Sequence, residues 1–325
     1  MFESLGLKGK IFFILLLSLT MILFLSVNSS FAKEKKNITI VLFHTEQPSE
    51  KSFKEVVGEA YDVNWTITSP NRSKEKLEEI MQAIDPATTD LVYTYGTTVG
   101  QFGRRILVPK GIPVVSCLPW DPVGAGIIDS WENSGAKITA SSINVPSEAQ
   151  LNTLKEVINF KRLGVVYNPN ESNGNISLEE AERLEGKLGF TIIPITFKGP
   201  EDIGKMKDEL VKNNADAAYL TACSSIIVEP KDLAEALIEL KMPAIAALGK
   251  NAKEGALLGL TADYGKVGAT AGRLAIRILR GEDPAKMGGA KQEKFELTVN
   301  LKSANRMGII IPVKLLKMAS EIIKD

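Results

Sequence analysis

The chain has 325 residues and a formal net charge of zero, with 39 Lys and Arg against 39 Asp and Glu. Balanced charge argues against nucleic acid as a partner, because phosphate binding requires a basic surplus on some face. The two cysteines, Cys117 and Cys223, are too few for a disulfide scaffold.

Residues 1–32 have the three parts of a secretory signal. Lys8 and Lys10 precede an apolar run over 11–27, and the segment 30–32 (SFA) supplies the small residues of a cleavage site. We predict cleavage there and a periplasmic location, and no nearby cysteine offers a lipid anchor. The alternative is an uncleaved membrane anchor, because the run lies between a signal-peptide core (~7–15 residues) and a spanning helix (roughly 18 or more).

The remaining chain, about 290 residues, has room for two domains of ~100–200 residues each. From residue 37, β-branched apolar runs alternate with segments of helical spacing, and few hairpin signals interrupt them. This order is typical of parallel βαβ units. It predicts strands at 37–43, 63–68, 91–95 and 113–117, and helices around 53–60, at 74–84 and from Gly96.

The same alternation restarts after residue 146 and continues to the end of the chain. It predicts helices over 147–160, 178–188, 202–213, 231–241, 265–280 and 312–323, and strands at 162–167, 190–197, 217–221, 244–247, 256–261 and 295–301. The spare elements at the end suggest that the chain re-crosses between two lobes. We therefore predict an α/β fold of two doubly wound parallel-sheet lobes, one from 37–144 plus about 264–295 and the other from 145–263 plus about 296–325.

Ligands of doubly wound sheets bind at the carboxyl ends of the strands, where helix N-termini present unpaired N–H groups. The turns that follow the predicted strands therefore supply the candidate ligand-binding residues. These are Glu46, Tyr95, Gly96, Thr97, Thr98, Trp120, Asp121, Asn168, Thr221, Ser224, Gly249 and Asp263.

Several of these residues also have a purely structural interpretation. The segment Gly96–Thr98 fits a simple helix cap, and Asp121 before a proline fits a helix N-cap. Trp120 suits a core as well as a stacking platform for a ligand. Asp263 either pairs with a ligand ammonium or caps the helix that follows it.

Residues suited to catalysis are scarce in this sequence. His44 is the only histidine, and the two cysteines fall in different halves without a CxxC or nucleophile-elbow pattern. No G-x-S-x-G, Walker or G-x-G-x-x-G motif follows a strand. We therefore predict a binding protein rather than an enzyme, with no cofactor and no metal. A disulfide between the halves would oppose hinge closure, so we expect two free, buried thiols.

The segment 117–127 (CLPWDPVGAGI) resembles a known family, the ABC transporter substrate-binding proteins that include the tryptophan-binding TrpX type. Four further segments resemble the same family in the same order. They are 93–98 (YTYGTT), 164–169 (GVVYNP), 261–264 (TADY) and the C-terminal stretch that contains 294–302 (KFELTVNLK) and 308–312 (GIIIP). The resemblance spans essentially the whole chain after residue 32.

The resemblance implies a type I periplasmic-binding-protein fold with three crossovers between its lobes. It also implies an aromatic amino acid as ligand, with the carboxylate on the N–H groups of Gly96–Thr98. The ammonium would meet Asp263 as first choice and Glu46 as second. Two features depart from the family pattern and put the ligand in doubt: the turn 44–47 after the first strand, and Trp120 where a smaller residue is expected.

Two functions remain open at this point. One is import, in which a monomeric protein captures a small organic solute in the interlobe cleft and hands it to an ABC permease in the inner membrane. The other is sensing, in which the same lobes report a ligand to a membrane receptor or kinase. Nothing in the chain separates these functions, but neighbouring genes for a permease and an ATPase would favour import.

Overall fold

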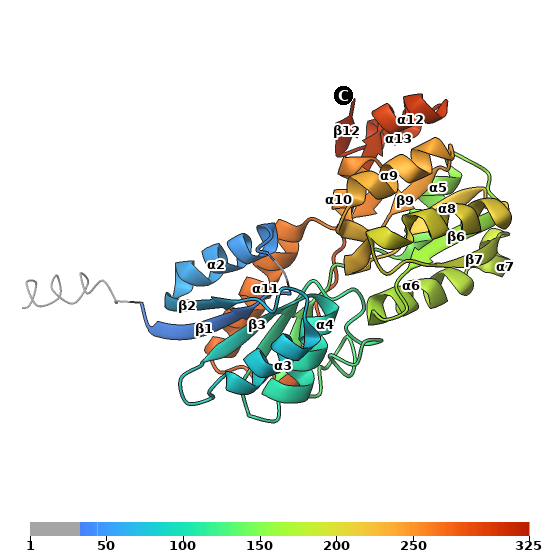
Figure 1. The fold of residues 1–325 in the computed structure, drawn as a ribbon. Coiled ribbons are helices and arrows are strands. Elements are labelled where there is room, and N and C mark those ends of the chain that lie inside the picture. Colours follow the sequence, from blue (N-terminus) through green and yellow to red (C-terminus); the bar gives the residue numbers. More distant parts are fainter. Residues whose placement is uncertain (1–32, 44, 325) are drawn as a thin grey trace, which may run out of the picture. The chain divides into compact units, whose positions relative to one another are not determined.

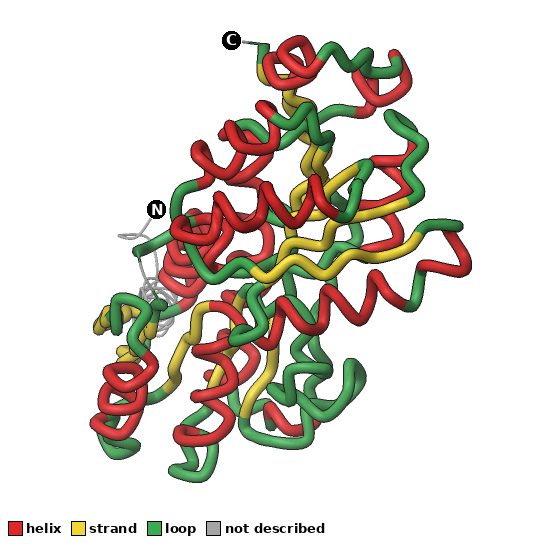
Figure 2. The backbone as a smooth tube through the Cα atoms, turned by 45° about the vertical axis from the view of Figure 1, so that its right-hand side comes forward, coloured by secondary structure: helices red, strands yellow, loops and turns green. Residues whose placement is uncertain are grey.

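The computed structural model describes residues 33–43 and 45–324, of which residues 36 onward belong to one compact unit. The predicted signal segment and His44 lie outside the described residues. Figure 2 shows the strands gathered in two groups with helices packed around them. No helix in the described part of the chain is long and apolar enough to cross a membrane.

The first lobe is built on a five-stranded sheet with the order β2-β1-β3-β4-β5. Its inner strands are parallel, and the two over residues 91–95 and 114–117 are almost fully buried, as expected of a sheet covered on both faces. The strands are β1 (Lys35–Val41), β2 (Asp62–Thr68), β3 (Leu91–Tyr95), β4 (Val114–Cys117) and β5 (Ile138–Ser141). Its helices are α2 (Pro48–Ala60), α3 (Lys74–Ala83), α4 (Gly96–Phe102) with the π-helical continuation η1 (Gly103–Leu107), and α11 (Tyr264–Leu279) with the 3-10 turn η4 (Pro284–Lys286) after it.

The second lobe is built on a seven-stranded sheet with the order β12-β11-β10-β9-β8-β6-β7, parallel except for the β10–β11 pair. The strands are β6 (Arg162–Tyr167), β7 (Thr191–Thr196), β8 (Ala217–Leu220), β9 (Ala244–Ala246), β10 (Leu258–Thr261), β11 (Glu296–Asn300) and β12 (Glu321–Ile323). Its helices are α5 (Ser147–Lys155), α6 (Ser172–Glu182), α7 (Glu185–Leu188), η2 (Pro200–Asp202), α8 (Ile203–Lys212), η3 (Ser224–Ile227), α9 (Pro230–Glu239), α10 (Gly249–Glu254), α12 (Leu301–Met307) and α13 (Val313–Met318). The predicted α/β fold of two parallel-sheet lobes is therefore confirmed.

The chain passes between the two sheets three times: after β5, after β10 and before β11 (Figure 1). The second passage returns α11 to the first lobe, where it packs directly against α2. This packing is close because Gly268 lacks a side chain: a Cβ there would lie 2.1 Å from the carbonyl oxygen of Ser49. The third passage then delivers β11 to the second sheet, next to β10.

Sequence-based expectations about several elements were wrong or incomplete. The final helix predicted over 312–323 ends at Met318, because Glu321–Ile323 forms β12 and pairs with β11 instead. The strand predicted to reach residue 301 ends at Asn300, whose side chain accepts a hydrogen bond from Ser303 N and begins α12. Strand β5 was not predicted, although it is fully buried beside β4.

Candidate functional site

A cavity opens where the carboxyl ends of strands from both sheets face each other. It holds about 590 Å³ of atom-free space, including the part open to solvent. We call it the ligand cavity. It is lined by Phe43, Tyr95, Gly96, Thr97, Thr98, Leu118, Trp120, Ile143, Glu171, Asn173, Ala222, Ser224, Ile227, Leu248 and Tyr264.

One end of the ligand cavity is formed by the first turn of α4. Gly96 has φ of +74°, a left-handed conformation that glycine adopts without strain. Tyr95 is the N-cap and contributes no side-chain cap to the helix. The first N–H groups of α4 are therefore left for another acceptor, and they carry the positive end of the helix dipole.

Thr97 also anchors the loop that follows β4. Its Oγ1 accepts a hydrogen bond of 3.1 Å from Trp120 N, and Ser142 Oγ donates one of 2.7 Å to Trp120 O. The Trp120 side chain is only 1% exposed, so it is part of the core and of the cavity wall at once. The core interpretation of Trp120 is therefore confirmed, and its role as a stacking platform stays a prediction.

Opposite this turn lies Glu171, in the loop between β6 and α6. Its carboxylate accepts bonds of 2.7 Å from Ser224 N and 3.1 Å from Ser225 N. Asn168 Nδ2 donates a further bond of 3.1 Å to the same carboxylate. Among the described residues that line the cavity, Glu171 is the only one with a charged side chain. Glu171 is therefore the anionic side chain of this wall.

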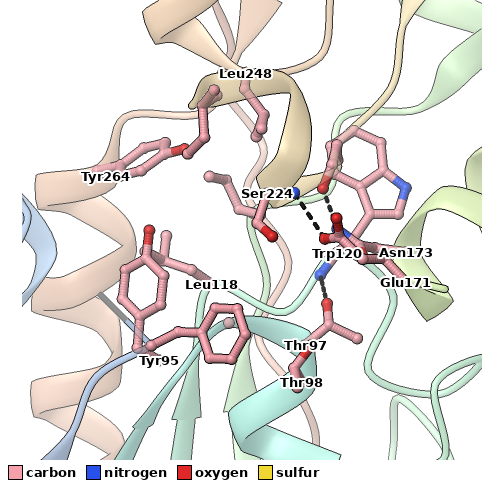
Figure 3. A pocket seen from close by; sticks show the side chains of 15 residues that line it. Tyr95, Thr97, Thr98, Leu118, Trp120, Glu171, Asn173, Ser224, Leu248 and Tyr264 are labelled. Carbon is pink, nitrogen blue, oxygen red and sulfur yellow. Dashed lines mark hydrogen bonds between the residues drawn. The ribbon is translucent and has the colours of Figure 1, made fainter. Parts of the chain in front are cut away.

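The other end of the cavity is aromatic and apolar. Figure 3 shows Tyr95, Tyr264 and Leu248 on one side, away from Thr97, Thr98, Glu171 and Asn173. Burial raises the pKa of Tyr264 to about 12 and that of Tyr95 well above its usual value. Both phenols are therefore neutral at physiological pH. The ligand cavity is thus polar at one end and apolar at the other.

Six of the residues proposed from the sequence line this cavity, namely Tyr95, Gly96, Thr97, Thr98, Trp120 and Ser224. Two others lie directly behind it. Asn168 holds Glu171, and the buried Thr221 donates through Oγ1 to Val166 O at 2.8 Å. These two residues support the wall without lining the cavity.

The remaining four residues lie elsewhere. Glu46 pairs with Lys54 Nζ at 2.5 Å, and Asp263 caps α11 through a 3.1 Å bond from Lys266 N. Asp121 accepts from Val123 N at 3.1 Å and begins a turn, so no helix follows it there as the N-cap interpretation required. Gly249 is the first residue of α10 and, with Asp263, lines a neighbouring cavity.

Glu171 and Asn173 were not predicted from the sequence, although they supply most of the polar side chains on the second lobe's wall. The sequence pointed to Glu171, because this residue comes directly after the Asn-Pro-Asn turn (168–170) that follows β6. The helix behind that turn was expected from residue 178, whereas α6 begins at Ser172. The first turn of α6 was not predicted, because residues 172–175 (SNGN) have low helix propensity.

Cys117 and Cys223 are free and buried, as expected. Cys117 lies behind the ligand cavity beside Tyr93, and Cys223 Sγ accepts from Asn168 N at 3.2 Å. Burial raises the pKa of Cys223 to about 12 and raises that of Cys117 as well. Both are therefore protonated packing residues, not nucleophiles.

Comparison with known proteins gives one family match and several similar structures. The family model described as "ABC transporter substrate binding protein" matches residues 49–323. A tyrosine-binding protein of Clostridioides difficile is 26% identical over 212 residues, which are 65% of this chain and 61% of that protein. The match therefore spans less than two thirds of that relative's length.

Two solved structures illustrate the shared fold. A domain from Streptococcus pneumonia in complex with L-Trp has a TM-score of 0.80 at 21% identity, covering 88% of this chain and 100% of that one. The ligand-free, open structure of a substrate binding protein from Clostridium difficile has a TM-score of 0.69 at 21% identity, covering 89% and 100%. These likenesses confirm the expected fold of type I periplasmic binding proteins.

Proposed function

Because the chain belongs to the family of ABC transporter substrate binding proteins, we propose that it captures an α-amino acid with an apolar or aromatic side chain. It is a solute-binding protein and not an enzyme. After capture in the cavity between the lobes, it delivers the amino acid to an ABC permease in the inner membrane.

The observation that carries this proposal is the polarity of the ligand cavity. A zwitterion needs a positive and a negative group close together, and the first turn of α4 and Glu171 are such a pair on opposite walls. The ligand carboxylate lies on the N–H groups of Thr97 and Thr98, where helix N-termini favour anions. The ligand ammonium lies on Glu171, which replaces Asp263 and Glu46 as the proposed partner.

The ligand side chain then points to the apolar end, toward Tyr95, Leu248 and Tyr264 (Figure 3). Aromatic rings at this end favour an aromatic or large aliphatic side chain, because they offer apolar area with preferred stacking geometries. The amino acids named with two relatives, tyrosine and L-Trp, agree with this assignment. The relatives thus support the proposed ligand class.

The proposed cellular setting follows from the family and from the predicted signal segment. An exported protein with a cleaved signal would work in the periplasm as a monomer and meet the permease there. The two lobes would close over the ligand, a hinge motion typical of such proteins.

The test is a thermal-shift screen of the purified protein against the twenty amino acids, followed by calorimetry on the hits. A ligand at about 100 times its Kd adds ~2.7 kcal/mol of stability. If no amino acid raises the melting temperature, the amino-acid proposal fails.

The ammonium partner is tested by three matched variants. Glu171→Gln removes a charge that faces the ligand and should weaken binding by about 2–5 kcal/mol, as expected for truncation of one member of a buried charge pair. Asp263→Asn and Glu46→Gln remove equal charges outside the ligand cavity and should leave the affinity within about twofold of wild type. A large effect of Asp263→Asn would restore the partner suggested by the sequence.

A further inference from the structure

A second cavity adjoins the ligand cavity at its apolar end. It holds about 1,020 Å³ of atom-free space, including the part open to solvent, and its walls include Gly249 and Asp263. Three residues line both cavities: Tyr95, Ile227 and Tyr264. We call these three residues the partition.

Each partition residue lies at one end of a helix. Tyr95 is the N-cap of α4, and Tyr264 is the first residue of α11, directly after the cap formed by Asp263. Ile227 ends η3, whose first N–H groups are bound by Glu171. The partition is therefore built from the ends of three helices, two of which are capped by the carboxylates of Asp263 and Glu171.

The partition lies where the side chain of the proposed ligand ends. The polar groups of the cavity are at the opposite end, so an amino acid bound through them directs its side chain toward Tyr95 and Tyr264 (Figure 3). All three partition side chains are only half-buried, because each has one surface toward either cavity. Beyond them lies empty space rather than packed core.

We propose that the partition sets the maximum length of the ligand side chain, and that the second cavity becomes part of the binding site when the partition is opened. This inference rests on the proposed function. It assigns a specificity role to Ile227 and Tyr264.

The test compares truncations that differ only in whether they open the partition. Ile227→Ala opens it, whereas Leu248→Ala removes a side chain of the same size from a position that lines the ligand cavity alone. Tyr264→Ala is a second opening variant, which keeps the test decisive if one substitution unfolds the protein. The probes are L-phenylalanine and L-4-phenylphenylalanine, which share the zwitterion and differ by one ring.

By calorimetry, wild type should bind phenylalanine and reject the longer probe, and Leu248→Ala should bind the longer probe no more tightly than wild type does. Ile227→Ala and Tyr264→Ala should bind the longer probe at least about tenfold more tightly than wild type does, the smallest gain expected from filling a new apolar space. Equal gains in Leu248→Ala, or no gain in either opening variant, would overturn the inference. A wild type that binds no amino acid would instead overturn the proposed function, so the two failures are distinguishable.

Discussion

Gln101 of α4 and Ser172 of α6 bind each other in both directions across the two lobes. Gln101 Nε2 donates to Ser172 Oγ at 3.0 Å, and Ser172 Oγ lies 3.2 Å from Gln101 Oε1. The same two helices begin with the two polar walls of the ligand cavity, at Gly96 and directly after Glu171. This pair therefore joins the elements that hold opposite ends of the proposed zwitterion.

We expect Gln101→Ala and Ser172→Ala each to weaken ligand binding, because the pair stabilises the arrangement in which both walls face the ligand. A hydrogen bond of this kind contributes about 0.5–1.5 kcal/mol, so each variant should raise Kd by roughly two- to tenfold. A double-mutant cycle measured by calorimetry should show that the two losses are not additive. Additive losses would mean that the two side chains act independently.

The buried carboxyl of Glu50 makes stability depend on pH. Tyr93 OH donates to Glu50, Ser49 Oγ donates to it at 2.8 Å, and Glu50 itself is 0% exposed. Burial raises the pKa of Glu50, and the bond from Tyr93 opposes this shift without cancelling it. The folded state therefore favours the protonated form, and ionisation costs folding free energy as pH rises.

It follows that Glu50 contributes most to stability below its unfolded pKa and that this contribution is lost as pH rises through the folded pKa. Denaturant unfolding of wild type and Glu50→Gln between pH of about 4 and about 7, which spans an ordinary carboxyl pKa, should show wild type losing stability relative to the variant. Glu59→Gln, at an exposed position of the same helix, should show no such trend. A difference that stays constant with pH would contradict this assignment.

Two glycines that lie in the α2–α11 helix pair should respond to alanine in opposite directions. A Cβ at Gly268 would meet the Ser49 backbone at 2.1 Å, whereas a Cβ at Gly58 meets nothing within 4 Å. Gly268→Ala should lower the free energy of unfolding by about 1–3 kcal/mol or more through overpacking. Gly58→Ala should raise it by about 0.5–1 kcal/mol through helix propensity. Similar denaturation midpoints for the two variants would show that the helices are not this close.

The two thiols should be inert in the folded protein. Burial raises the pKa of both, which suppresses the reactive thiolate. With a disulfide-exchange reagent at mildly alkaline pH, we expect no labelling in native buffer and labelling of both Cys117 and Cys223 once denaturant unfolds the chain. Rapid labelling of one thiol in native buffer would place it at an accessible surface.

Much of the fold could be predicted from the sequence, because most strands and helices are indicated by the pattern of residues within one short segment. Apolar runs such as 91–95 and 217–220 are buried strands, and the alternation of strands with amphipathic helices requires parallel βαβ packing. The prediction failed at 312–323 because β12 is stabilised by pairing with β11, a contact between distant segments. The apolar periodicity of one segment does not show which distant segment it pairs with.

The sequence by itself determined that polar residues at strand ends, such as Thr97 and Ser224, would gather at one edge of each sheet. Only the tertiary structure decided which carboxylate lines the ligand cavity. Asp263 and Glu171 both follow a strand, but Asp263 turns back to cap its own helix, whereas Glu171 reaches Ser224, 53 residues away. Each carboxylate accepts hydrogen bonds from the backbone N–H groups that the fold brings within reach. The sequence does not show which N–H groups those are, because they can lie far away along the chain.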